Sequence, residues 1–182
     1  MKIFIGALVG GIIIFIWQFL SWTVLDLHQS AQQYTPKQDS ILAYLNTQFD
    51  SSGGYFMPRT PKGASSDDMK KLEETTMGKP WVQIAYHKSY DASMVVNILK
   101  ALVTDIVIVL LFCWVLAGFT VNSFGKTFLA ALFTSLIIFL CSNYIVYIWY
   151  DTFDLSAYLT DYLVSWGITG IWLGWWLNKK KV

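Results

Sequence analysis

Acidic and amide side chains inside long apolar runs are the residues of this sequence that point most directly to chemistry. Asp105 stands inside the run that begins at Ala101, and Asp161 inside the run that begins at Leu155. An ionisable side chain in a membrane-spanning helix is costly to bury, so it faces a bundle interior or a wet cavity. We predict one polar cluster, with a binding or structural role, in the outer half of the membrane: Gln18, Ser21, Asn97, Lys100, Thr104, Asp105, Asn143, Tyr144 and Asp161.

Asp105 is the deepest acidic residue of this predicted cluster. Lys100 precedes it by five positions, which places the two side chains roughly 140° apart around a helix and makes them a poor pair. Asp105 is therefore expected to find its partner on another helix or in a loop, with Gln18, Asn143 and Tyr144 as candidates. Two roles stay open for it, a structural one that holds helices or a loop together, and a binding or proton-handling one.

The two histidines and two cysteines give no clear cofactor site. His28 and His87 both lie outside the apolar runs, so a haem held by two histidines within the bundle is not expected. A metal site that combines His28, His87 and a carboxylate is a minor alternative, and surface histidines are the favoured interpretation. Cys113 and Cys141 lie in apolar runs and are interpreted as core residues. With no phosphate-binding loop and no nucleophile motif, we predict no cofactor and no catalytic residue.

The composition favours a small multi-pass membrane protein. Of 182 residues, 55% are hydrophobic and only 14% are charged, which is too apolar for an ordinary soluble domain. The net charge of +1 gives no reason to expect nucleic acid as a partner. Four apolar runs have the ~20 residues needed to cross a ~30 Å hydrocarbon core. They are Ile3–Leu25, Ala101–Phe119, Thr127–Trp149 and Leu155–Leu177. The predicted fold is all-α, with four transmembrane helices and a small extracytoplasmic α/β insertion between the first two.

Flanking lysines predict the orientation. Lys2, Lys126 and Lys179–Lys181 lie on one side of the runs, so the positive-inside rule places both termini in the cytoplasm. The first run is too long for a signal-peptide core and lacks an Ala-x-Ala site, so it is interpreted as a retained anchor. The predicted organisation is helix 1 in 1–28, an extracytoplasmic segment in 29–95 and helices 2–4 in 96–182.

The extracytoplasmic segment carries signals for helix, strand, helix and strand in that order. Thr35, Pro36 and Gln38 suggest a capping box at the start of a helix over 36–48. A short strand is predicted at Tyr55–Met57, a helix over 67–77 that stops at Gly78, and a strand over 81–87. The segment is too small for a large core of its own, so we expect it to pack on the outer ends of the helices.

Small and aromatic residues predict how the helices contact each other and the membrane. Gly6 and Gly10, like Gly170 and Gly174, form GxxxG pairs that allow close helix packing. Packing within the chain is favoured, and a homo-oligomer through these faces is the alternative. Tryptophan suits the membrane interface, so we predict that Trp17 and Trp22 lie at the outer interface. The inner belt is predicted to consist of Trp172, Trp175 and Trp176.

The chain resembles a family of small four-span bacterial inner-membrane proteins of uncharacterised function. The resemblance is carried by Gly10-Gly11 leading into "FIWQFLSW", by Leu27-His28, by "GGYFMP", by the Asp105-bearing run and by "NYIVYIWYDTFDL". Members tend to have glycine where Gln18 stands and proline where Asp26 stands, so the local geometry there is expected to differ. The resemblance implies a topology and location in a bacterial inner membrane, and it implies no activity.

Three functions fit these observations. The favoured one is a non-enzymatic accessory, assembly or scaffold subunit that binds a membrane-protein partner through its periplasmic loop and outer membrane half. The main rival is a small-molecule or lipid-binding or transport protein with an outward-open polar cavity lined by Gln18, Asp105 and Asn143. A membrane enzyme that uses Asp105, His28 or Asp161 is the third. A pore is disfavoured because polar side chains stop about halfway along the runs. Membrane lipid is the expected partner of the apolar helix surfaces.

Overall fold

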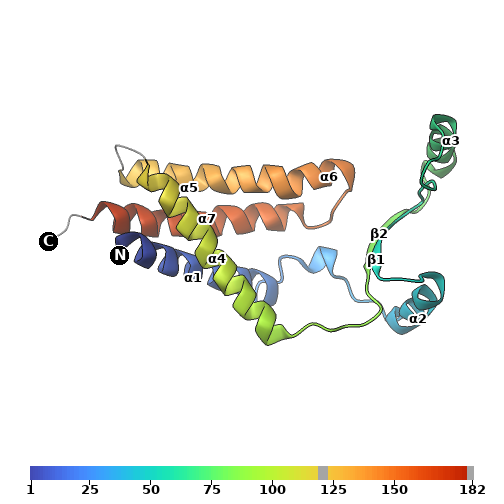
Figure 1. Ribbon diagram of the computed structural model, residues 1–182, viewed down its shortest axis with the longest axis horizontal. Helices are drawn as coiled ribbons and strands as arrows, with labels where there is room; N and C mark the ends of the chain where they lie inside the picture. Colours follow the sequence, from blue (N-terminus) through green and yellow to red (C-terminus); the bar gives the residue numbers. More distant parts are fainter. Residues whose placement is uncertain (119–122, 180–182) are drawn as a thin grey trace. The chain divides into compact units, whose positions relative to one another are not determined.

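The computed structural model describes residues 1–118 and 123–179, and the chain divides into two compact units (Figure 1). The first, the helical unit, comprises Met1–Gln33 and Ser93–Val182. The second, the insert, comprises Tyr34–Ala92, a little less than the predicted segment 29–95. Helices dominate the described residues, and one small two-stranded antiparallel sheet lies in the insert.

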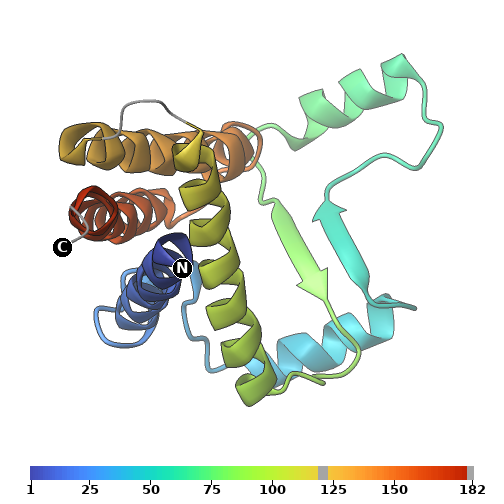
Figure 2. The same cartoon turned by 60° about the vertical axis from the view of Figure 1, so that its left-hand side comes forward.

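Within the described residues, the helical unit contains four long helical segments (Figures 1 and 2). They are α1 (Lys2–Thr23), α4 (Met94–Ala117), the helix of α5 (Phe124–Phe139), η2 (Leu140–Tyr144) and α6 (Ile145–Trp149), and α7 (Leu155–Asn178). A short 3₁₀ turn, η1 (Gln29–Ala31), follows α1. Helix α1 packs on both α4 and α7, and α7 also packs on α5. The turn η2 is π-helical and continues α5 directly into α6.

Three of these segments are long and apolar enough to cross a membrane: α1, α4 and Phe124–Trp149. This finding suggests an integral membrane protein with several spans. Helix α7 has sufficient length at 24 residues, but it is not among the three, and its Asp, Ser, Thr, Tyr and Trp residues make it less apolar.

Helix α4 starts seven residues before the predicted Ala101, so Asn97 and Lys100 belong to its first turns. Its predicted end at Phe119 lies outside the described residues.

Glycines allow close approach between the helices of the unit. A Cβ on Gly10 would lie 2.8 Å from a methyl carbon of Val109 on α4, and one on Gly170 would lie 2.8 Å from Cβ of Ala131 on α5. Gly6 faces Leu173 and Trp176, and Gly174 faces Phe124 in the same manner. The glycine faces are thus filled within the chain. Association with a second copy stays a prediction.

The first turn of α1 and the last turn of α7 meet at one end of the helical unit. Lys2 Nζ donates to the carbonyl oxygens of Leu177, at 3.0 Å, and Lys179, at 2.6 Å. Trp176 Nε1 donates to the carbonyl oxygen of Lys2, and Trp172 Nε1 to that of Gly6. These two tryptophans therefore join α7 to α1, and their place in an inner belt stays a prediction.

The insert has the predicted order of elements. Its elements are α2 (Gln38–Gln48), β1 (Gly53–Met57), α3 (Ser66–Thr76) and β2 (Val82–Tyr86), and the two strands pair antiparallel with Tyr55 opposite Ile84. The ring of Phe49 stacks on that of Tyr55 at 3.8 Å and lies 5.2 Å from that of Tyr86. Packing of the insert on the ends of the helices stays a prediction.

Of the two helices of the insert, α3 begins with a capping box and α2 does not. Ser65 and Asp68 form a complete capping box at the start of α3, and Gly78, with φ of 76°, follows the cap residue Met77 at its end. The predicted capping box at Thr35 is wrong, because α2 begins at Gln38 and its N-cap Lys37 offers no side-chain acceptor. Thr35 Oγ1 instead accepts from the backbone N–H of Lys37, which forms a local turn before the helix.

Candidate functional site

Helix α7 presents a buried polar stripe at its N-terminal half. Asp154 precedes the helix, and Tyr158, Asp161 and Ser165 follow at intervals of four, three and four residues. These intervals place the four side chains on one face of a helix. Asp154, Asp161 and Ser165 are buried, so this face points into the helical unit and not toward lipid.

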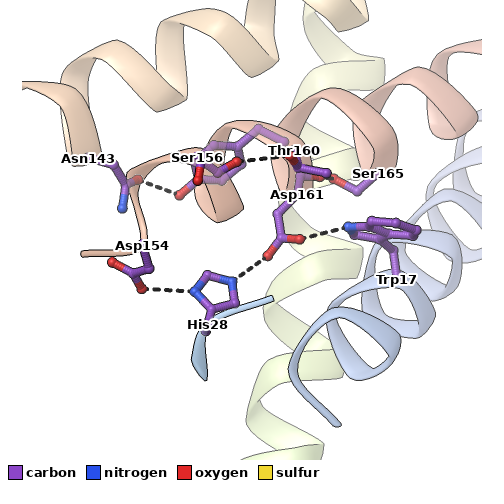
Figure 3. A network of polar contacts seen from close by, with 9 residues as sticks. Trp17, His28, Asn143, Asp154, Ser156, Thr160, Asp161 and Ser165 are labelled. Atoms are coloured by element: carbon purple, nitrogen blue, oxygen red, sulfur yellow. Dashed lines mark hydrogen bonds and ion pairs between the residues drawn. The ribbon is translucent and has the colours of Figure 1, made fainter. Parts of the chain in front are cut away.

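His28 reaches the stripe from the turn that follows α1. Asp26 adopts a positive φ of 51° in this turn, a conformation that aspartate tolerates and proline cannot adopt. The turn brings His28 to two carboxylates, with Nδ1 2.9 Å from Asp154 Oδ2 and Nε2 3.0 Å from Asp161 Oδ2 (Figure 3). His28 is only 2% exposed, so the interpretation of a surface histidine is wrong.

Aromatic rings enclose the imidazole and orient its second carboxylate. Trp22 stacks on His28 with ring centroids 3.8 Å apart and planes 3° apart, and Tyr158 meets the same ring edge-on at 4.7 Å. Trp17 Nε1 donates to Asp161 Oδ1 at 3.0 Å (Figure 3). Trp17 and Trp22, which were predicted as interface anchors, form part of this arrangement, and the anchoring itself stays a prediction.

The contacts of His28 require one proton more than a neutral imidazole and two ionised carboxylates carry. A neutral imidazole has one N–H donor and one acceptor nitrogen, whereas an ionised carboxylate only accepts. Because both ring nitrogens face carboxylates, either His28 is an imidazolium or one of Asp154 and Asp161 carries a proton. The three side chains, which we call the His28 cluster, hold one net negative charge in either state.

A cavity of about 550 Å³ lies beside the His28 cluster, between the C-terminal part of α1, the N-terminal halves of α4 and α7, and Ile138 of α5. Its lining is polar and aromatic as well as aliphatic, and it consists of Ile14, Gln18, Trp22, Lys100, Ala101, Thr104, Asp105, Ile108, Ile138, Tyr158, Asp161, Tyr162, Ser165 and Trp166. This size suits a small organic ligand or a lipid headgroup.

Asp105 is the unusual member of this lining. It is 3% exposed, and its Oδ1 accepts a hydrogen bond of 3.2 Å from Gln18 Nε2, one of the partners expected from sequence. Its second oxygen, Oδ2, is buried and has no hydrogen-bond partner among the described residues. A buried carboxylate oxygen without a partner is costly, so Asp105 is the candidate binding residue of this lining.

The predicted polar cluster is gathered only in part. Five of its members line the cavity: Gln18, Lys100, Thr104, Asp105 and Asp161. Asn143 is not among the residues that line the cavity, and its Oδ1 accepts from Tyr162 Oη at 2.9 Å and from Ser142 Oγ at 2.8 Å. Tyr144 contacts the rings of Phe139 and Tyr147, Asn97 is exposed, and Ser21 is fully buried with no partner for its hydroxyl among the described residues.

Sequence reasoning missed Asp154, Tyr158, Tyr162 and Trp166 as site residues. The available signal was the spacing from Asp154 to Ser165, which repeats at helical period in a stretch that otherwise looks like a membrane span. No signal of this kind identifies His28, because its partners lie more than a hundred residues away along the chain.

The described residues contain no group of three or more histidine, cysteine or acidic side chains that could hold a metal ion. His28 uses both ring nitrogens in hydrogen bonds to carboxylates, so it has no free nitrogen for a metal. His87 belongs to the insert.

Comparisons of the chain with family models, with curated proteins and with solved structures found no match. The resemblance to small bacterial inner-membrane proteins stays a prediction.

Proposed function

We propose that the protein is a multi-pass membrane protein whose helical unit binds a small ligand in the cavity beside Asp105. Asp105 lines a cavity of about 550 Å³, and its buried Oδ2 has no hydrogen-bond partner among the described residues; these two facts together carry the proposal. A structural carboxylate is normally saturated by hydrogen bonds from its own chain, as Asp161 is by Trp17 and His28. Among the described residues, Asp105 accepts a hydrogen bond from Gln18 alone. Of the functions considered from sequence, ligand binding gains the most support.

The apolar opposite half of the unit supports a binding site over a continuous pore. Where the helices meet in that half, Val109, Cys113 and Leu173 are each at most 1% exposed. Another cavity, of about 1180 Å³, lies at that end, and most of the residues that line it are apolar. Trp172 and Trp176 donate to backbone carbonyls of α1 in this half and hold the helices together. A conduction path needs polar or wet surface over the whole membrane depth.

The proposed membrane arrangement has four spans, with α7 as the fourth and both termini in the cytoplasm of a bacterial cell. Lys2 and Lys179, which meet at one end of the unit, support placing both termini on one side. Gln18 and Asp161 lie toward the other ends of α1 and α7, and Asp105 lies at the middle of α4, so we place the cavity in the outer half of the membrane. The polar stripe of α7 explains why this helix is less apolar than the other segments.

A second candidate function is the accessory or scaffold role favoured from sequence. The insert exposes large apolar side chains, with Leu42 57% exposed, Trp81 47% and Met77 74%. Exposed apolar residues on a small folded unit are suited to a protein partner. Crosslinking in intact cells from Trp81, replaced by a photoreactive residue, tests this role against the same replacement at Thr60.

Native mass spectrometry of the protein in mild detergent tests the ligand-binding proposal. The expected result is a bound small molecule or lipid that Asp105→Asn releases and that Asp50→Asn, an exposed change of the same kind in the insert, retains. A parallel flux assay in proteoliposomes should show no ion permeability in either form. Solute flux that Asp105→Asn abolishes would replace the binding proposal with a transporter, and no bound species in any preparation would contradict it.

A further inference from the structure

We infer that the ligand of this cavity presents a primary ammonium group, whose N–H donors bind Asp105 Oδ2. This inference rests on the proposed function and names the chemistry of its ligand. The position of the group follows from which carboxylate oxygens are unoccupied. Asp161 also lines the cavity, but its Oδ1 accepts from Trp17 and its Oδ2 faces His28. Of the four carboxylate oxygens of Asp105 and Asp161, the two acidic residues in the lining, only Asp105 Oδ2 is buried without a partner among the described residues.

The charges around the cavity favour a cation over a neutral donor. The His28 cluster holds one net negative charge in either protonation state, and an ionised Asp105 adds a second. Lys100 is the one basic residue in the lining, it is exposed, and no ion pair joins it to Asp105 within the described residues. A negative charge therefore remains uncompensated in a region of low dielectric, where an ion pair with a ligand is strong.

The aromatic part of the lining fits the same cation. Trp22, Tyr158, Tyr162 and Trp166 all line the cavity. Rings of this kind attract an ammonium group placed over their faces within about 6 Å of the centroid. One donor atom is expected to bind Oδ2 while the carbon next to the nitrogen packs on these rings. A hydroxyl or amide donor would gain the hydrogen bond without this attraction.

Two sources can supply such a group, and they share this chemistry. One is the ethanolamine headgroup of a phospholipid, whose phosphate would lie near the exposed Lys100. The other is a free alkylamine that enters from the aqueous side. The cavity volume of about 550 Å³ accommodates either.

Tryptophan fluorescence measures the binding directly, because Trp22 and Trp166 line the cavity. The full chain is placed in nanodiscs of phosphatidylglycerol, and the probes are phosphatidylethanolamine, phosphatidylcholine, free butylamine and free butanol. The expected result is saturable binding of an amine probe, with Kd raised about tenfold or more by Asp105→Asn, since charge-assisted hydrogen bonds have that magnitude. Asp50→Asn should leave Kd unchanged, and Asp105→Glu should retain the preference for amines over butanol.

Each outcome decides the inference. Binding of phosphatidylethanolamine without butylamine identifies a lipid headgroup, and binding of butylamine identifies a free amine. Equal binding of phosphatidylcholine, which has no N–H donor, or of butanol overturns the ammonium assignment. A non-amine species found by native mass spectrometry and released by Asp105→Asn also overturns it, but leaves the proposed function intact. No bound species and no response to any probe removes both.

Discussion

His28 Nε2 lies 3.0 Å from Asp161 Oδ2, although 133 residues separate the two along the chain. The same ring reaches Asp154 through Nδ1, so a single side chain joins the turn after α1 to the start of α7. Trp17 holds the other oxygen of Asp161. One wall of the cavity therefore depends on a contact that neither helix could make alone.

His28→Ala is expected to destabilise the protein by about 3 kcal/mol or more, because it leaves two buried carboxylates without their shared partner. His28→Gln should recover part of this loss, since its amide donates to one carboxylate. Unfolding of the purified protein in detergent measures the difference. His87→Ala, an exposed change in the insert, is the control and should have no effect. Equal stability of His28→Ala and the wild type would contradict the role assigned to the cluster.

Gly11→Ala is expected to loosen the contact between α1 and α4. A Cβ at this position would lie 2.6 Å from Cα and 2.7 Å from the backbone nitrogen of Ile106, so the helices must separate. Overpacking of this kind typically costs about 1–3 kcal/mol. Gly125→Ala is the matched control, because nothing lies within 4 Å of its Cβ and alanine favours helix. A thermal unfolding series should give a lower Tm for Gly11→Ala only, and equal Tm values would show that the helices are not in contact here.

The capping box between Ser65 and Asp68 predicts that the start of α3 is sensitive to acid. Hydrogen bonds from the Ser65 side chain and backbone lower its pKa below the usual value of 3.8. A carboxyl with a lowered folded-state pKa stabilises the helix fully above its unfolded pKa and loses this contribution as pH falls through the folded value. Amide exchange, corrected for intrinsic rates, should show lost protection in Ser66–Thr76 below about pH 4.

The variant Asp68→Asn should show the same loss of α3 protection at neutral pH. Asp67→Asn is its control, because Asp67 lies in the same first turn and takes no part in the capping box. If both variants behave alike, the helix dipole and not the capping box holds this end.

Thiol labelling tests the proposed orientation. Single cysteines at Ser51 and Ser66, in a background without Cys113 and Cys141, should react in intact cells with an impermeant maleimide. A cysteine at Gly125, near the start of α5, should react only after the cells are opened. The reason is the distribution of lysines, which places the termini and this end of α5 in the cytoplasm. Labelling of Gly125→Cys in intact cells would reverse the orientation.

The sequence by itself determined the features that depend on local pattern. Long apolar runs are read from composition alone, since a helix in lipid must satisfy its backbone internally and present apolar side chains. The elements of the insert were also predictable, because the end signal at Gly78 and the alternation in 81–87 act over a few residues. Local pattern failed at Thr35, where a turn and a helix cap share the same signal.

Only the tertiary structure decided which polar residues meet. Asp105 had several candidate partners of equal merit, and the approach of α1 to α4 selected Gln18 and left Asn143 to Tyr162. His28 looked like a surface residue because it lies outside the apolar runs, and its burial comes with contacts to Asp154 and Asp161 at the start of a distant helix. Such contacts depend on helix packing, which glycines such as Gly10 and Gly170 set through steric fit. Steric fit between distant segments is a property of three dimensions, and periodicity along one chain does not encode it.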